Sequence, residues 1–219
     1  KKQFTIKDIY CYAHDHLLDW FPDLPSYVAF VQRLNRVGDV FPGLIETILK
    51  DIGKKELVQK VYLLDSLPII MANAKRSSQA KVAKEFADKG YCSSKDMYFY
   101  GVKLHIMGHK RQETIPLPEY VGLTPASDHD LSAFRQISPY LRNIKIFLDK
   151  AYNDEQEEKY LREQQNVVLY KPVKKKKGQK TLSLFDRLFS RTVNRIRQPI
   201  ESLFNWIQEK THIQNASKV

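Results

Sequence analysis

The sequence has little cysteine and no long apolar run. Its 219 residues include only two cysteines, Cys11 and Cys92, too few for the disulfide framework of a small secreted protein. We therefore expect a reducing compartment, the cytoplasm. No run of about 18 apolar residues is present, which argues against a transmembrane helix. Residues 1–20 also lack the apolar centre and small-residue cleavage site of a signal peptide.

Motifs for nucleotide binding and for serine hydrolysis are missing as well. Neither GxGxxG nor GxxxxGKS/T occurs, so nucleotide-driven chemistry has no support, and no GxSxG nucleophile elbow is present. Hydrophobic residues at 42% and aromatic residues at 11% nevertheless indicate a folded core rather than a disordered chain. The length fits one catalytic-size domain with a small helical appendage. Because the chain begins with Lys1, we expect a fragment of a longer protein.

Positive charge is concentrated near the C-terminus. The formal net charge is +11, with 36 basic and 25 acidic residues. Residues 171–219 hold 12 of the basic and 3 of the acidic ones, so this segment carries +9 and the preceding 170 residues only +2. A solvated basic tail would explain the surplus, but a surface that faces DNA explains it better, since nucleic acid is the commonest anionic partner.

The first 60 residues have the pattern of helices. Pro25-Ser26 is a helix start, apolar residues follow at helical spacing up to Val37, and Gly38 is a plausible stop. A second helix is predicted from about residue 44 to residue 52. No strand partner is evident here, so we predict a small helical subdomain over residues 1–60 and a boundary at residue 61.

Strands and helices alternate beyond that boundary. The predicted strands are 61–65, 97–107, 115–123, 143–148 and 167–170. Residues 75–96 are predicted to form an exposed loop or a short helix. Pro116 and Pro118 make the third strand an edge or bulged strand. Three strands followed by helix, strand, helix, strand and helix predict a mixed α/β sheet that is covered by helices.

Three helices belong to this part of the chain. They are predicted from 127 to about 141, over 154–165 and over 182–211. Ser127 or Asp128 is expected to cap the first of them. Pro199 is expected to break or restart the last, and the lysine run around Gly178 is expected to be a loop.

Two of the apolar strands end in an aspartate. Asp65 follows the first strand and Asp149 follows the fourth. A carboxylate at the end of a buried strand must be paired, hydrogen-bonded or bound to metal. If the two strands are neighbours, both carboxylates meet at one edge of the sheet, where they would suit Mg²⁺. The alternative is that each aspartate caps a following turn.

Five short motifs follow one another along the chain. They are Leu64-Asp65-Ser66, Tyr98-x-Tyr100-Gly101-x-Lys103-x-His105, Ser127-x-His129-Asp130, Asp149-Lys150-Ala151-Tyr152 and Arg197-x-x-x-Glu201. In this order they resemble the DDE transposases of bacterial insertion sequences, whose fold is ribonuclease-H-like. The resemblance covers residues 61–210, and Tyr27-x-x-Phe30-x-x-Arg33-Leu34 is similar to the helical region that precedes the catalytic domain.

The resemblance implies a catalytic triad of Asp65, Asp149 and Glu201. In such enzymes the triad holds two divalent ions, Mg²⁺ or Mn²⁺, for DNA cleavage and strand transfer by in-line phosphoryl transfer. It also implies that 61–219 is the catalytic domain and 1–60 a DNA-binding or accessory region. The implied partners are the terminal inverted repeats of the element, target DNA and a second copy of the chain, within the bacterial nucleoid.

Further residues receive roles from the same resemblance. Those expected beside the carboxylates or against DNA are Lys103, His105, Asp130, Lys150, Tyr152 and Arg197. Those expected on the DNA backbone are Lys174, Lys175, Lys176, Lys177, Arg191 and Arg195. The family pattern has Tyr where this chain has Asn194 and Lys where it has Gln208, a departure that bears on phosphate contacts near the end of the last helix.

Alternatives remain at several of these positions. Arg197 and Glu201, four residues apart, could be a surface ion pair of small energetic value. Asp128 and Asp130 compete with Asp149 as the second ligand, although a helix start also explains them. His105 is equally well explained as a core histidine.

A metal site elsewhere and two other functions are the remaining alternatives. Cys11-x-x-His14-x-His16 has metal-ligand residue types but no second half, so an incidental cluster is the better interpretation. His105 and His109 share one strand face and lack a third ligand. The alternative functions are a nuclease of the same fold that cuts without joining, and an inactive DNA-binding remnant of a transposase.

Overall fold

The computed structural model describes residues 5–45, 47–48, 60–73, 75, 80, 83–92, 96–175 and 177–213. Helix α1 (Ile6–His16) starts at a capping box, in which Thr5 and Asp8 each bond the other's backbone N–H. Helix α2 (Tyr27–Arg36) starts at Ser26, as predicted. Residues 40–45 and 47–48 are also helical, and the rest of the helix predicted up to residue 52 lies outside the described residues.

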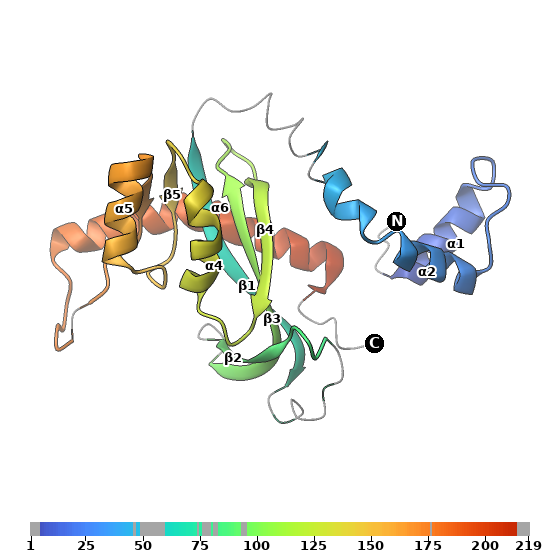
Figure 1. Ribbon diagram of the computed structural model, residues 1–219, viewed down its shortest axis with the longest axis horizontal. Helices are drawn as coiled ribbons and strands as arrows, with labels where there is room; N and C mark the ends of the chain where they lie inside the picture. Colours follow the sequence, from blue (N-terminus) through green and yellow to red (C-terminus); the bar gives the residue numbers. More distant parts are fainter. Residues whose placement is uncertain are drawn as a thin grey trace.

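The two N-terminal helices form a small pair without a core. The ring of Tyr10 lies 5.4 Å from the rings of both Tyr27 and Phe30, and its hydroxyl donates to the carbonyl of Pro25 at 2.9 Å. No residue of α1 or α2 is buried. The pair is thus held by a few aromatic contacts, and the two helices lie beside each other in Figure 1.

A six-stranded mixed sheet forms the centre of the remaining chain (Figure 1). Its strands are β1 (Val61–Asn73), β2 (Asp88–Cys92), β3 (Met97–His109), β4 (Leu117–Pro125), β5 (Lys145–Phe147) and β6 (Val168–Tyr170). They lie in the order β2-β3-β1-β5-β6, and β4 also pairs with β3. The β1–β3, β2–β3 and β3–β4 pairs are antiparallel, whereas β1–β5 and β5–β6 are parallel.

Helices cover both faces of the sheet because successive side chains of a strand point to opposite sides. Leu64 and Ile146 pack with residues of α4 (Asp130–Ile137) and α5 (Glu155–Gln165) in one core. Leu63 packs with Ile200 of α6 (Leu184–Thr211) in the other. In Figure 1, α6 crosses the face of the sheet opposite to α4. This mixed sheet between helices confirms the predicted ribonuclease-H-like fold.

Strand β1 is longer than predicted. It continues past Asp65 to Asn73 because β3 pairs with it along this whole length. The expectation that the strand ends at Asp65 is therefore wrong, although the start of the strand at residue 61 is correct. Pro68 is tolerated inside β1, with a register partner at Lys103.

Strand β2 lies inside residues 75–96, where no strand was predicted. Its sequence, Asp-Lys-Gly-Tyr-Cys, has little intrinsic preference for a strand, and pairing with β3 supplies the strand conformation. Gly90 is required by a close approach, since a Cβ there would lie 2.1 Å from the carbonyl oxygen of Ala126. The predicted three-strand start of the domain is thus a four-strand start.

Strand β4 is an edge strand, as predicted, although it spans Leu117–Pro125 rather than residues 115–123 and leaves Pro116 outside. Within the described sheet it pairs only with β3, and the register shifts between Met107 and Gly108, where Pro118 is the partner of Gly108.

Two helix predictions need correction. The N-cap of α4 is His129 rather than Ser127 or Asp128, because a turn bonds the Asp128 N–H to the carbonyl of Pro125 and delays the helix. The helix ends at Ile137 and is followed by the 3-10 turn η2 (Ser138–Tyr140).

Helix α6 runs through Pro199 without a break. Proline removes one helical hydrogen bond, but buried Val193, Ile200, Leu203 and Phe204 hold the helix to the sheet on both sides of it. The predicted break at Pro199 is therefore wrong.

Candidate active site

Strand register brings Asp65 and Asp149 to the same level of the sheet, just beyond the end of the β1–β5 ladder. The parallel β1–β5 ladder ends with the pair Leu63 and Phe147. Asp65 and Asp149 each lie two residues beyond that pair, and on parallel strands they therefore leave the ladder at the same height and on the same edge. The convergence expected from the sequence thus follows from the register, even though β1 itself continues.

The Arg197 side chain, on helix α6, connects this helix to strand β1. Its Nη1 donates to Oδ2 of Asp65 at 2.5 Å, and its Nη2 donates to Oε1 of Glu201 at 3.2 Å. The Arg197 side chain is only 13% exposed, against 54% for Glu201. The Arg197–Glu201 pair is therefore part of a three-residue bridge between α6 and β1, rather than the isolated surface pair that the sequence left open.

The charges of the neighbouring carboxylates affect the pKa of Asp65. Burial is the main cause that raises the pKa of the Asp65 carboxyl to about 6, from the 3.8 of an ordinary aspartate. Arg197 and the backbone N–H of Ser66 lower that pKa, whereas the charges of Asp149 and Glu201 raise it. Asp65, Asp149 and Glu201 are thus close enough to form one negatively charged site with a single arginine inside it.

An open groove of about 430 Å³ runs along this site. Its lining residues come from the chain after β5, from the chain after β6 and from α6: Asp149, Lys150, Pro172, Asn194, Arg195, Arg197, Gln198 and Glu201. Two of the three carboxylates and three basic side chains therefore share one concave surface. A groove that joins carboxylates to basic groups can hold a phosphodiester beside a cation.

The Tyr152 side chain lies behind the carboxylates. Its backbone N–H donates to the carbonyl of Asp149 at 3.2 Å, which closes the turn after β5. Its ring is 1% exposed and stands edge-on to Phe134 at 6.1 Å. Burial, together with the charges of Asp130, Asp65 and Asp149, raises the pKa of this hydroxyl well above its ordinary value. The residue supports the turn that carries Asp149.

Lys103 and Asp130 form an ion pair next to that turn. The Nζ of Lys103 donates to Oδ1 of Asp130 at 3.2 Å and to the carbonyl of Asp128 at 2.6 Å. Asp130 is thus held as the partner of a lysine at the start of α4, where it also meets the positive end of the helix.

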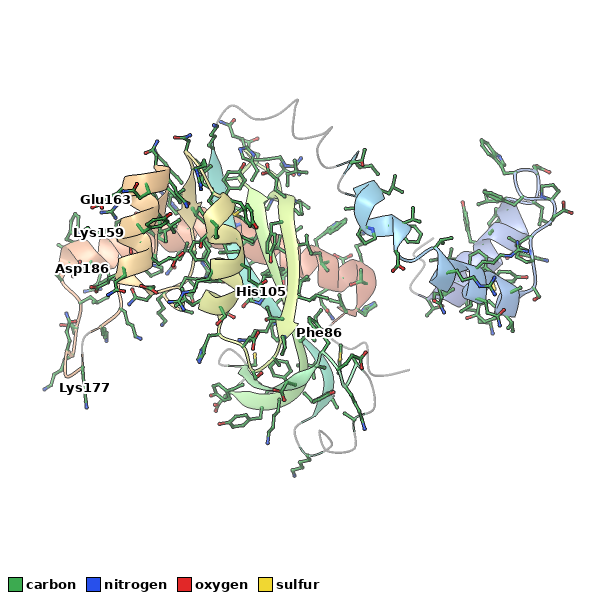
Figure 2. The ribbon with its side chains drawn as sticks, viewed as in Figure 1. Phe86, His105, Lys159, Glu163, Lys177 and Asp186 are labelled. Carbon is green, nitrogen blue, oxygen red and sulfur yellow. The ribbon has the colours of Figure 1, made fainter. Side chains whose placement is uncertain are left out.

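His105 is a core residue in this fold. It is 1% exposed, and its Nε2 lies 2.9 Å from Oγ1 of Thr124 on the neighbouring strand. Figure 2 shows its side chain in the middle of the sheet. Burial lowers the pKa of the imidazole, so the neutral ring is favoured. This is the core alternative that the sequence left open.

The lysine run after β6 is an exposed loop. Lys174, Lys175 and Lys177 are exposed, and Lys176 lies outside the described residues. Lys175 donates to the carbonyl of Lys180 at 2.9 Å, and Figure 2 shows Lys177 at the far end of the loop. Arg191 and Arg195 are exposed on α6. This basic surface leads toward the groove, which Arg195 also lines.

The sequence analysis missed two basic residues near α6. Lys110 and Arg111, in the turn between β3 and β4, line a second depression together with Arg195 and Gln198. Because Arg195 and Gln198 also line the first groove, the two depressions adjoin. The signal was a Lys-Arg pair in a predicted strand connection. Lys171, by contrast, is bound to Glu158 at 2.6 Å.

The described residues hold no ready-made metal site. Among them, no set of three His, Cys, Asp or Glu side chains stands in an arrangement that could hold a metal ion. Two of the three carboxylates, Asp65 and Glu201, contact the guanidinium of Arg197 instead. None of the described helices combines the length and the apolar character of a membrane span.

The fold and the site define a ribonuclease-H-like domain with one carboxylate on the central strand β1, a second just after β5 and a third on α6. A comparison with protein-family models matches residues 55–218 to the transposase DDE domain. The chain therefore belongs to the transposase DDE domain family and is a DNA transposase by family, and enzymes of this family generally use divalent metal ions. No curated protein and no solved structure matches the chain.

Proposed function

We propose that Asp65, Asp149 and Glu201 are the catalytic carboxylates of a transposase that cleaves DNA and transfers the strand by metal-dependent phosphoryl transfer. The observation that supports this most is the bridge from Arg197 to Asp65 and Glu201, residues from two elements far apart in the sequence. Asp149 joins them through the register of β5. Three carboxylates near one another are unfavourable unless a cation lies among them.

The residues of the site fit divalent ions by their chemistry. Carboxylate oxygens are hard ligands that Mg²⁺ and Mn²⁺ accept. Three carboxylates against one arginine leave an excess of negative charge, which contributes to the raised pKa of Asp65. Asp65, Asp149 and Glu201 would hold the ions, which number two in our proposal. When bound, such ions activate the attacking oxygen and stabilise the leaving oxygen.

The remaining residues would position DNA. Lys150 and Arg195 are exposed at the groove and would neutralise phosphates on either side of the scissile bond. Tyr152 would hold the turn that carries Asp149, and the Lys103–Asp130 pair would fix the start of α4 behind it. Lys174 to Lys177 and Arg191 would follow the backbone further away, at a distance where only charge matters.

The organisation of the whole molecule belongs to the same proposal. Residues 61–219 would be the catalytic domain and residues 1–60 an accessory or DNA-binding region. The substrates would be the terminal inverted repeats of a bacterial insertion sequence and its target DNA, in the nucleoid of the cytoplasm. Two element ends must be brought together, so the active complex would be a homodimer.

Asp149→Asn tests the proposal. We expect Mg²⁺-dependent cleavage of DNA that carries the element ends to fall below detection, because one metal ligand is removed while the shape of the turn is kept. Nonspecific DNA binding, measured by fluorescence anisotropy, should remain nearly unchanged.

Asp88→Asn is the matched control, since Asp88 is an exposed carboxylate on the edge strand β2. It should retain wild-type cleavage. Full cleavage by Asp149→Asn would contradict the triad. A strand-transfer assay on the wild type separates a transposase from a nuclease of the same fold, which would cut and never join.

A further inference from the structure

The bridge of Arg197 has a consequence for ion binding. The guanidinium contacts Oδ2 of Asp65 at 2.5 Å and Oε1 of Glu201 at 3.2 Å. These oxygens belong to two of the three proposed metal ligands. The fork of an arginine fits such a pair of acceptors well, and each contact is a charge-assisted hydrogen bond. One positive side chain therefore lies between the carboxylates that a metal ion would use.

An arginine and a divalent ion cannot share this position easily. Mg²⁺ places its oxygen ligands at about 2.0–2.1 Å in a near-octahedral geometry. A guanidinium at hydrogen-bond distance from the same oxygen would lie against the ion. The two cations repel each other, and the low exposure of Arg197, 13%, leaves little water to screen them. Ion binding at Oδ2 of Asp65 thus requires the guanidinium to leave.

Arg197 has a second place to go. Its Nε is buried and has no hydrogen-bond partner among the described residues, so the side chain is not fully satisfied where it lies. It also lines the open groove, next to Arg195 and Gln198. A phosphate in that groove could accept from Nε and one Nη together, which is the paired contact that arginine makes best.

We infer that Arg197 is a displaceable counter-ion: it bridges Asp65 and Glu201 until a divalent ion binds there, and it then turns to a DNA phosphate in the groove. This inference rests on the proposed function, because it uses the same carboxylates. It predicts that ion binding and DNA binding strengthen each other through one side chain, since coupling between two ligands is reciprocal.

Mn²⁺ binding in the absence of DNA tests the first half. Free Mn²⁺ is measured by electron paramagnetic resonance during titration of the full chain. Arg197→Gln removes the competing cation, so we expect Mn²⁺ to bind about fivefold tighter or more than to the wild type. Equal or weaker binding would overturn the inference, because it would mean that Arg197 keeps the ligands in place.

Arg195→Gln is the matched control. It removes the same charge from the same helix and the same groove, but Arg195 is exposed, and none of the described carboxylates contacts it in the way that Asp65 contacts Arg197. Its Mn²⁺ affinity should stay within about twofold of the wild type, because charges at the surface are screened. A gain as large as that of Arg197→Gln would attribute the effect to net charge alone and overturn the inference.

Folding is checked by circular dichroism. If Arg197→Gln does not fold, Arg197→Lys carries the test, because lysine keeps the charge but lacks the fork that reaches both carboxylates. It should bind Mn²⁺ tighter than the wild type, by less than the glutamine variant. No gain in this variant would contradict the inference.

Asp65→Asn separates this inference from the proposed function. Loss of Mn²⁺ binding in Asp65→Asn, together with no gain in Arg197→Gln, would reject the inference alone. Wild-type Mn²⁺ binding in Asp65→Asn would reject the proposed metal site itself, and the inference with it.

DNA binding tests the second half. With a short labelled duplex of unrelated sequence, Mn²⁺ should increase the DNA affinity of the wild type about fivefold or more, measured by fluorescence anisotropy. Most of this increase should disappear in Arg197→Gln. Arg195→Gln should bind DNA more weakly throughout and keep the increase. The same increase in Arg197→Gln as in the wild type would overturn the coupling.

Discussion

Helices α5 and α6 contain the same local pattern and use it differently. Each has an arginine and a glutamate four residues apart, Arg162 with Glu158 on α5 and Arg197 with Glu201 on α6. The first pair bonds at 3.1 Å and the second at 3.2 Å, although the glutamate precedes the arginine on α5 and follows it on α6. The Arg162 side chain is 60% exposed and that of Arg197 only 13%.

The difference comes from what each helix packs against. Lys159 and Glu163 lie on the outer side of α5, away from the sheet (Figure 2). Arg197 instead faces β1 and meets Asp65 there. An exposed pair along a helix contributes a few tenths of a kcal/mol, whereas a buried carboxylate depends on its cation. An i, i+4 pair thus becomes part of the candidate site where its arginine is buried and reaches a carboxylate of another element, as Arg197 does and Arg162 does not.

The largest expected difference between the two helices concerns catalysis. Glu201→Gln should lower Mg²⁺-dependent cleavage by about a thousandfold or more, because the loss of a metal ligand removes several kcal/mol of transition-state stabilisation. Glu163→Gln, an equal change on α5 where Glu163 is 55% exposed, should leave the rate of cleavage as it is. Rates on end-containing DNA measure both. A similar loss of cleavage rate in both variants would contradict a catalytic role that is specific to Glu201.

The next effect concerns stability and pH. The pKa of Asp65 is raised to about 6 in the folded protein, so between about pH 4 and pH 6 the folded state binds more protons than the unfolded one. Stability therefore falls as pH rises through this range. Asp65→Asn cannot titrate. Its free energy of unfolding, relative to that of the wild type, should increase by about 1–3 kcal/mol from about pH 4 to pH 8, which means that the variant becomes relatively more stable.

Urea unfolding in EDTA at several pH values measures this difference. A pH-independent difference between Asp65→Asn and the wild type would show that Asp65 is not held in a buried, negatively charged site.

A smaller effect concerns the basic loop that precedes α6. Replacing Lys174, Lys175, Lys176 and Lys177 together with alanine should weaken binding to all DNA sequences alike. It should also reduce the slope of log affinity against log salt, by about 0.9 for each phosphate that is no longer neutralised. Anisotropy titrations over a series of salt concentrations measure the slope. An unchanged slope would assign the loop to solubility alone and leave the groove residues of α6 as the DNA contacts.

The smallest expected effect is on α5 itself. Arg162→Ala should change the free energy of unfolding by less than about 0.5 kcal/mol, since the Arg162 side chain is exposed and Glu158 keeps Lys171 as a partner at 2.6 Å. Thermal unfolding of this variant beside Arg197→Ala measures the contrast. If Arg162→Ala lost as much stability as Arg197→Ala, the difference in burial between the two arginines would have no effect on stability.

Much of the fold could be predicted from the sequence because its signals are local. Apolar runs marked β1, β3, β5 and β6, and the change to helical spacing marked α5 and α6. Strand β2 was missed because its residues have weak strand preference and become a strand only against β3. The prediction at Pro199 was wrong for the opposite reason, since packing on both sides of the proline outweighs one missing helical hydrogen bond.

The candidate site, too, was only partly predictable from the sequence. Local pattern by itself determined that acids follow two apolar runs and that Arg197 and Glu201 share one helix face, because strand patterns and the helical repeat depend on neighbours in the sequence. Only the tertiary structure decided that Arg197 reaches Asp65, 132 positions away in the chain. The packing of α6 on β1 brings the two together, and no spacing of residues encodes a contact between a helix and a strand so far apart.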